Sequence, residues 1–175
     1  MKVNRFVVLL FLLTIIVCTD AFCQQKSSYT YYNGLGFAIK KVYSLEKNTT
    51  YLNTARRIKN GPKILDAFVC AQNIEKNDPN EINIINIHIV EETNPEASLQ
   101  SYLKDLSSQG IKYKLRSWNG LTGVEYSFKQ DMGTVMLPTK AFWGYKGNKF
   151  FLIQLASLSN CVSKYETLLN SIIIL

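Results

Sequence analysis

Hydrophobic and polar residues alternate along much of the chain, which predicts a protein built mainly from β-strands. The clearest case is residues 82–90, where Ile85, Ile87 and Ile89 alternate with Ile84, Asn86 and His88, which is the period of a strand. Asn119-Gly120 is the dipeptide favoured in two-residue hairpins, and Lys146-Gly147-Asn148 is a second turn sequence. We therefore expect a β-meander, with strands at 112–118, 121–128, 134–145 and 150–157.

A helix is predicted directly after the strand at 82–90. Asn94 is a suitable N-cap, Pro95 occupies the first helical position, and Gly110 is placed to end the helix. Between them, apolar residues recur at the spacing of one helical face, at Leu99, Tyr102, Leu103 and Leu106.

A second helix is predicted at the C-terminal end. Ser163 and Glu166 have the spacing of a capping box, and the apolar positions that follow keep the helical period to Leu175. Two amphipathic helices separated by strands indicate an α+β fold, with a single antiparallel β-sheet on which both helices pack.

The first 23 residues are predicted to be a secretory signal peptide. Lys2 and Arg5 precede an apolar run over residues 6–17, and these 12 residues are too few for a membrane-spanning helix, which needs about 20. We expect residues 24–35 to form a flexible N-terminal segment and residues 36–175 to form one domain.

Two cysteines in the signal region bear on location. Ala21 and Cys23 place small residues before a cleavage at Gln24, which predicts a soluble exported protein. Lipidation at Cys18 or Cys23 is the alternative, and we expect contact with a membrane only in that case. The composition, rich in Ile, Asn and Lys, favours a bacterial source, so the predicted location is periplasmic or extracellular.

The charge pattern suggests a binding surface. The chain carries a formal net charge of +7, with 19% charged and 47% hydrophobic residues, which excludes an intrinsically disordered protein. Lys112, Lys114 and Arg116 alternate, so on a strand they share one face. This basic stripe is a candidate contact for a protein, a glycan or an anionic envelope component, and the alternative is a solvated sheet face. No nucleic-acid-binding motif is present, and we expect no nucleic acid partner.

Three aromatic residues near the hairpin turns extend this candidate surface. Trp118 flanks one turn, and Trp143 and Tyr145 lie before the next. Exposed aromatic side chains beside basic residues are typical of protein or glycan contacts. The alternative is that they pack in the core under the helices.

The residues with catalytic potential are few. His88 is the only histidine, which excludes sites that need two, and we expect no metal and no cofactor. Cys70 and Cys161 are predicted to form a disulfide, because paired cysteines are usual outside the cytoplasm. Two alternatives remain: a thiol nucleophile with His88 as its base, or two free buried thiols.

The order of elements resembles the PsbP-like α/β/α sandwich family. The similar features are early strands, a helix at 95–108, a meander with the hairpin sequence Gly120-Leu121-Thr122-Gly123, and a terminal helix that closes the sheet. The resemblance covers most of residues 36–175. Family members are mostly non-enzymatic accessory or assembly factors, so the resemblance implies a non-catalytic protein, and it transfers no residue roles.

Taken together, these patterns predict an exported bacterial accessory or binding protein of the cell envelope that is not an enzyme. The first alternative is a secreted thiol-dependent hydrolase. The second is a carrier of an apolar ligand, with a cavity between helix and sheet.

Overall fold

The computed structural model describes residues 28–55, 57, 63–72, 83–133 and 135–175. The predicted signal peptide and the candidate lipidation sites Cys18 and Cys23 lie outside these residues. Within them, none of the helices is both long and apolar enough to cross a membrane.

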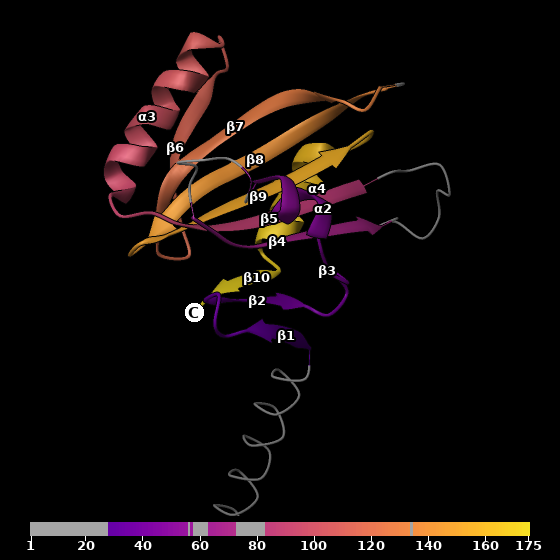
Figure 1. Ribbon diagram of the computed structural model, residues 1–175. Coiled ribbons are helices and arrows are strands. Elements are labelled where there is room, and N and C mark those ends of the chain that lie inside the picture. The colour runs from indigo at the N-terminus through magenta and orange to yellow at the C-terminus, as the bar shows by residue number, and fades with distance from the viewer. Residues whose placement is uncertain (1–27, 56, 58–62, 73–82, 134) are drawn as a thin grey trace, which may run out of the picture.

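A seven-stranded antiparallel sheet forms the centre of the molecule (Figure 1). Its spatial order is β3-β4-β5-β9-β8-β7-β6. The strands are β3 (Glu46–Lys47), β4 (Lys63–Gln72), β5 (Asn83–Glu91), β6 (Tyr113–Trp118), β7 (Leu121–Asp131), β8 (Met136–Lys146) and β9 (Lys149–Ser157). The predicted meander is confirmed, because β6 to β9 follow one another in both sequence and space.

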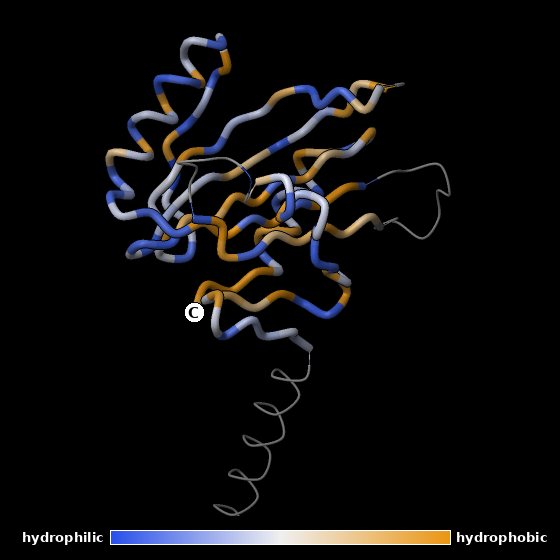
Figure 2. The backbone as a smooth tube through the Cα atoms, in the orientation of Figure 1, coloured by the Kyte–Doolittle hydropathy of each residue, from blue (hydrophilic) through white to orange (hydrophobic). Residues whose placement is uncertain are grey.

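A second, three-stranded sheet corrects the prediction of a single sheet. It has the order β1-β2-β10, with β1 (Tyr29–Tyr32), β2 (Phe37–Lys40) and β10 (Ile172–Ile174). Strand β1 lies inside the segment 24–35 that we predicted to be flexible, and its pairing with β2 gives it regular structure. Figure 2 shows the hydrophobic colour of β10 beside that of β2, and the two strands pair because both have apolar side chains to bury.

The C-terminal helix ends earlier than predicted. Helix α4 spans Cys161–Leu169, and the chain then turns into β10 rather than continuing to Leu175 as a helix. Its N-cap is Asn160, which makes no side-chain cap hydrogen bond, so the predicted capping box at Ser163 is wrong. The other helices are α2 (Thr49–Ala55), which we did not predict, and α3 (Pro95–Ser108), which begins at the predicted Asn94 cap.

The two faces of the large sheet carry separate hydrophobic cores. On one face, α3 packs Leu99, Leu103 and Leu106 against alternate residues of β7, β8 and β9. On the other face, α4 and the three-stranded sheet cover β4, β5 and β9 in the larger core. Helix α2 lies on the same face as α3, since its Tyr51 stacks on His88 of β5, and the neighbours Ile87 and Ile89 point into the opposite core. Strand β6 is the last strand of the large sheet, at the end opposite to β3.

Candidate functional site

Strand β6 is the open edge of the large sheet. It pairs with β7 on one side, and within the described residues no strand pairs with its other side. At the opposite edge the two-residue strand β3 pairs with Phe68 and Val69 of β4. Tyr113 and Leu115 are 40% and 64% exposed, on a strand of a protein that otherwise buries most large apolar side chains. An exposed edge strand is a template for pairing with another chain.

The turn between β6 and β7 determines which backbone groups of β6 face outward. Asn119 and Gly120 have φ values of 48° and 77°, as a two-residue type I′ hairpin requires. Trp118 and Leu121 flank this turn and therefore form a hydrogen-bonded pair. Because hydrogen-bonded and non-hydrogen-bonded pairs alternate along antiparallel strands, the backbone N–H and C=O groups of Arg116 and Lys114 also form hydrogen bonds with β7. The N–H and C=O groups of residues 113, 115 and 117 consequently point away from the sheet.

The hairpin is held against the three-stranded sheet. The Asn119 side-chain amide donates a hydrogen bond of 3.0 Å to the carbonyl oxygen of Ile172 in β10. On the same side, the Arg116 guanidinium forms a bidentate pair with Glu166 of α4, at 2.9 and 3.0 Å. These contacts fix the position of β6 while leaving its outer edge open.

Arg116 is part of a compensated charge cluster beneath α4. It also donates to Glu125 of β7, and the Lys140 Nζ atom lies 2.7 Å from the other oxygen of Glu125. Hydrogen bonding from Arg116 lowers the pKa of Glu166 below its usual value. The Lys140 ammonium also lies 5.1 Å from the centre of the Tyr165 ring. Two positive and two negative side chains therefore neutralise one another at this place.

The structure divides the predicted basic stripe of Lys112, Lys114 and Arg116. Arg116 has a side chain that is only 26% exposed and is bound to carboxylates, so it does not belong to a free basic surface. Lys112 and Lys114 are exposed and form no ion pair with the described residues. The sequence pattern did not reveal Glu166 as the partner of Arg116, because the two residues are 50 positions apart and no local signal connects them.

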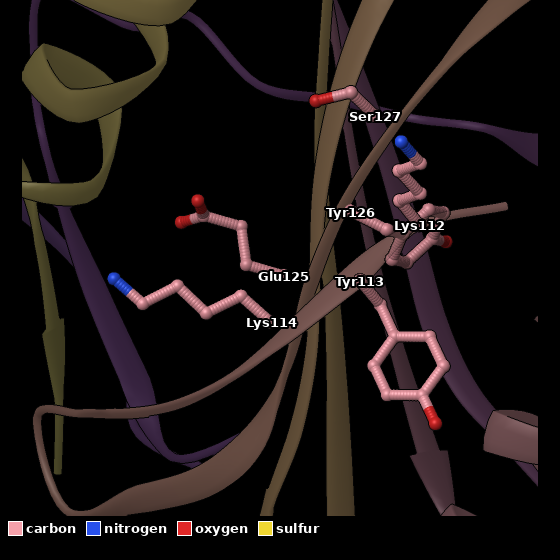
Figure 3. A pocket seen from close by; sticks show the side chains of 6 residues that line it. All are labelled: Lys112, Tyr113, Lys114, Glu125, Tyr126 and Ser127. Atoms are coloured by element: carbon pink, nitrogen blue, oxygen red, sulfur yellow. The ribbon is translucent and has the colours of Figure 1, made fainter.

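Two open pockets flank β6. One, of about 380 Å³, lies between α3 and β6 and is lined by Leu99, Leu103, Leu115 and Tyr145 among others. The other, of about 370 Å³, lies at the start of β6. Figure 3 shows that Lys114 and Glu125 extend to one side of this second pocket's strands, whereas Tyr113 extends to the other. The edge strand thus has an apolar side and a charged side.

The aromatic candidates are partly buried, and each packs against one of the two cores. Trp118 stands edge-on to Phe142, with ring centroids 5.6 Å apart. Trp143 lies against Phe150, with centroids 5.1 Å apart, under α3. Of the three predicted contact aromatics, only Tyr145 lines a pocket. Trp118 and Trp143 therefore pack against the cores, as in the alternative to a surface contact.

The structure contradicts the predicted disulfide, because Cys70 and Cys161 are both free. The Cys161 sulfur lies 3.4 Å from the carbonyl oxygen of Pro138 and 3.5 Å from that of Leu155. Cys70 is two strands away from Leu155, across β5, or about 10 Å at the usual strand spacing. A disulfide needs Cα atoms within roughly 7 Å. Burial raises the pKa of both thiols, which disfavours the reactive thiolate.

His88 is not placed to activate either thiol. It lies on the face of β5 covered by α2, whereas Cys70 and helix α4 lie on the opposite face of the sheet. His88 is 9% exposed and stacks on Tyr51 with ring centroids 4.1 Å apart. Its Nε2 atom has no hydrogen-bond partner in the described part of the chain. Burial lowers the pKa of His88 from 6.5 to about 4.

The described residues therefore define an α+β protein with an open, positively charged sheet edge. They contain no group of three His, Cys, Asp or Glu side chains placed to hold a metal ion.

Comparisons with known proteins extend only to the fold. No protein-family model and no curated protein matches the chain. The solution structure of cyanobacterial PsbP (CyanoP) from Synechocystis sp. PCC 6803 is similar, at 12% sequence identity. The match covers 84% of this chain and 91% of that one, with a TM-score of 0.49. It concerns the fold alone.

Proposed function

We propose that this chain is an exported, non-catalytic accessory protein that binds another protein through the edge strand β6. The observation that carries the proposal is the exposure of this strand. Its outer backbone groups have no partner strand among the described residues, and Tyr113 and Leu115 display apolar side chains beside Lys112 and Lys114.

The placement of the reactive side chains supports binding rather than catalysis. The two thiols and the one histidine lie on opposite faces of the sheet, so they form no nucleophile–base pair. Arg116, Glu125 and Glu166 are occupied by one another. The pockets at β6 are open and have charged residues in their walls, which does not favour a carrier that encloses an apolar ligand.

Site-specific photo-crosslinking in the source bacterium tests this proposal. A photoreactive residue replaces Leu115 in the full chain, and the matched control carries it at Val162, which is 60% exposed on a different element, α4. We expect a discrete protein adduct at position 115, absent at position 162 and lost when Lys112 and Lys114 are both changed to Glu.

Equal adducts at both positions, or none at position 115, would show that β6 is not the binding surface. The intact mass of the secreted fraction tests export in the same cells. We expect a chain that starts at Gln24, and a chain that stays in the cytoplasm with residues 1–23 would refute the exported location.

A further inference from the structure

We infer that the partner adds to β6 as an eighth strand, through an extended segment in which acidic and apolar residues alternate. This inference rests on the proposed function and specifies the chemistry of the partner at the same site. Three features of the edge carry it: backbone groups with no partner strand among the described residues, leucine side chains in the pocket on the face toward α3, and the exposed Lys114 on the other face.

The backbone of β6 is arranged to receive another strand. The type I′ turn assigns the outward N–H and C=O groups to Tyr113, Leu115 and Ser117. These groups alternate along a strand that is ordered by β7 on its inner side and anchored through Asn119 to β10. An extended peptide can therefore complete the ladder without any rearrangement of the sheet, as in other cases of strand addition.

The face toward α3 selects apolar side chains. The pocket of about 380 Å³ between α3 and β6 has Leu99, Leu103 and Leu115 in its wall, with Glu96 and Gln100 of α3 at the same site. Leu115 is 64% exposed, so a side chain inserted beside it would bury apolar surface that now faces solvent. Side chains of an added strand alternate between faces, so every second residue of the segment meets this pocket.

The opposite face selects acidic side chains. Lys114 extends to this face beside Glu125, as Figure 3 shows, whereas Lys112 lies at the start of β6 and extends away from them. The carboxylate of Glu125 is already bound by Arg116 and Lys140, so it does not cancel the charge of Lys114. Acidic residues on the incoming strand would find a complementary potential there.

The same charges disfavour a second copy of this chain as the occupant. Two β6 strands paired edge to edge would bring the exposed Lys114 of one copy close to the same basic edge of the other. Like charges opposite one another destabilise a strand pair, and edge lysines are a common protection against self-association. The charge of the edge therefore favours an acidic partner over a second copy.

Hydrogen exchange measured by NMR on the full exported chain tests the inference. The probe is a ten-residue peptide of alternating Glu and Val with blocked ends, and the matched control alternates Lys and Val. With the Glu peptide we expect the amides of Tyr113, Leu115 and Ser117 to exchange more slowly by tenfold or more. The amides of Lys114 and Arg116, already bonded to β7, should change little.

Two variants at one position separate backbone pairing from side-chain contact. Leu115→Pro removes an outward N–H and leaves the bonds to β7 intact, because proline is tolerated at such edge positions. Leu115→Thr keeps the N–H and removes only the apolar contact. We expect Leu115→Pro to weaken peptide binding by about tenfold more than Leu115→Thr does, the equivalent of one hydrogen bond. The spectrum of each variant shows whether it is folded.

The outcomes distinguish this inference from the proposed function. Binding of the Glu peptide without protection of the three outward amides would overturn strand addition, as would equal loss in the two variants. Equal binding of the Lys peptide would overturn the acidic preference. If neither peptide binds while crosslinking at position 115 still captures a partner, strand addition by an alternating segment is wrong and β6 remains the binding surface.

Discussion

Acidification should destabilise this protein through one buried side chain, His88. The folded state buries the imidazole against Tyr51 of α2, and among the described residues its Nε2 atom has no hydrogen-bond partner, which disfavours the charged form. The pKa of His88 in the folded protein is about 4, compared with 6.5 for an unperturbed histidine. Because the folded pKa is the lower one, the unfolded chain takes up the proton first as the pH falls.

The size of the effect follows from these two values. Each pKa unit corresponds to about 1.4 kcal/mol, so the difference between 6.5 and about 4 sets a limit of roughly 3 kcal/mol. This contribution to stability is fully present above pH 6.5 and is lost as the pH falls toward about 4. By linkage, about 2 kcal/mol should already be lost between pH 7 and pH 5.

Urea unfolding of the wild type and of His88→Gln, at several pH values between 7 and 4, measures this contribution. The difference between the two proteins removes the titration of the other groups, and it should change by about 3 kcal/mol across the range. An NMR titration of the imidazole gives the folded-state pKa directly. Parallel stability curves for the two proteins, or a titration midpoint near 6.5, would refute the burial argument.

Three further results are expected. Gly123→Ala should lower the free energy of unfolding by about 2 kcal/mol or more, because the new Cβ atom would lie 2.3 Å from a carbonyl oxygen of β8. Gly34→Ala, which meets nothing within 4 Å, should change it by less than about 0.5 kcal/mol in the same urea titration. Arg116→Met should cost about 2 kcal/mol, because it leaves two carboxylates of the α4 cluster without their main partner; an unchanged unfolding midpoint would contradict this. Mass spectrometry of unreduced, denatured protein should show alkylation of both Cys70 and Cys161, and a single unreacted pair would restore the disulfide.

The elements predicted correctly are those whose signals are local. The strand at 82–90 is seen as β5, Asn83–Glu91, because its β-branched residues alternate with the period of a strand. Helix α3 begins at Asn94, whose side-chain oxygen accepts a hydrogen bond from the N–H of Ala97 at 3.1 Å. The Asn119-Gly120 turn has both positive φ values that its sequence predicts.

The elements missed are those that depend on distant partners. The apolar run Ile172–Ile174 fits a helix or a strand equally well, and its pairing with Ile39 and its neighbours in β2 makes it a strand. Helix α2 has seven residues, too few to show a clear period. The contacts of Arg116 and His88 also depend on distant elements, because Arg116 binds Glu166 of α4 and His88 stacks on Tyr51 of α2.

For this protein, therefore, composition and pattern were sufficient for the fold class, the meander and the alternation of side chains along β6. These properties follow from backbone geometry and from the turn residues, which act over a few positions. Contacts between segments that are far apart in the chain decide the remaining properties. These properties are the strand at the edge of the sheet, the charges that are neutralised and the distance between the two thiols. Those contacts depend on how the layers bury their apolar faces, and so they appear only when the whole chain is packed.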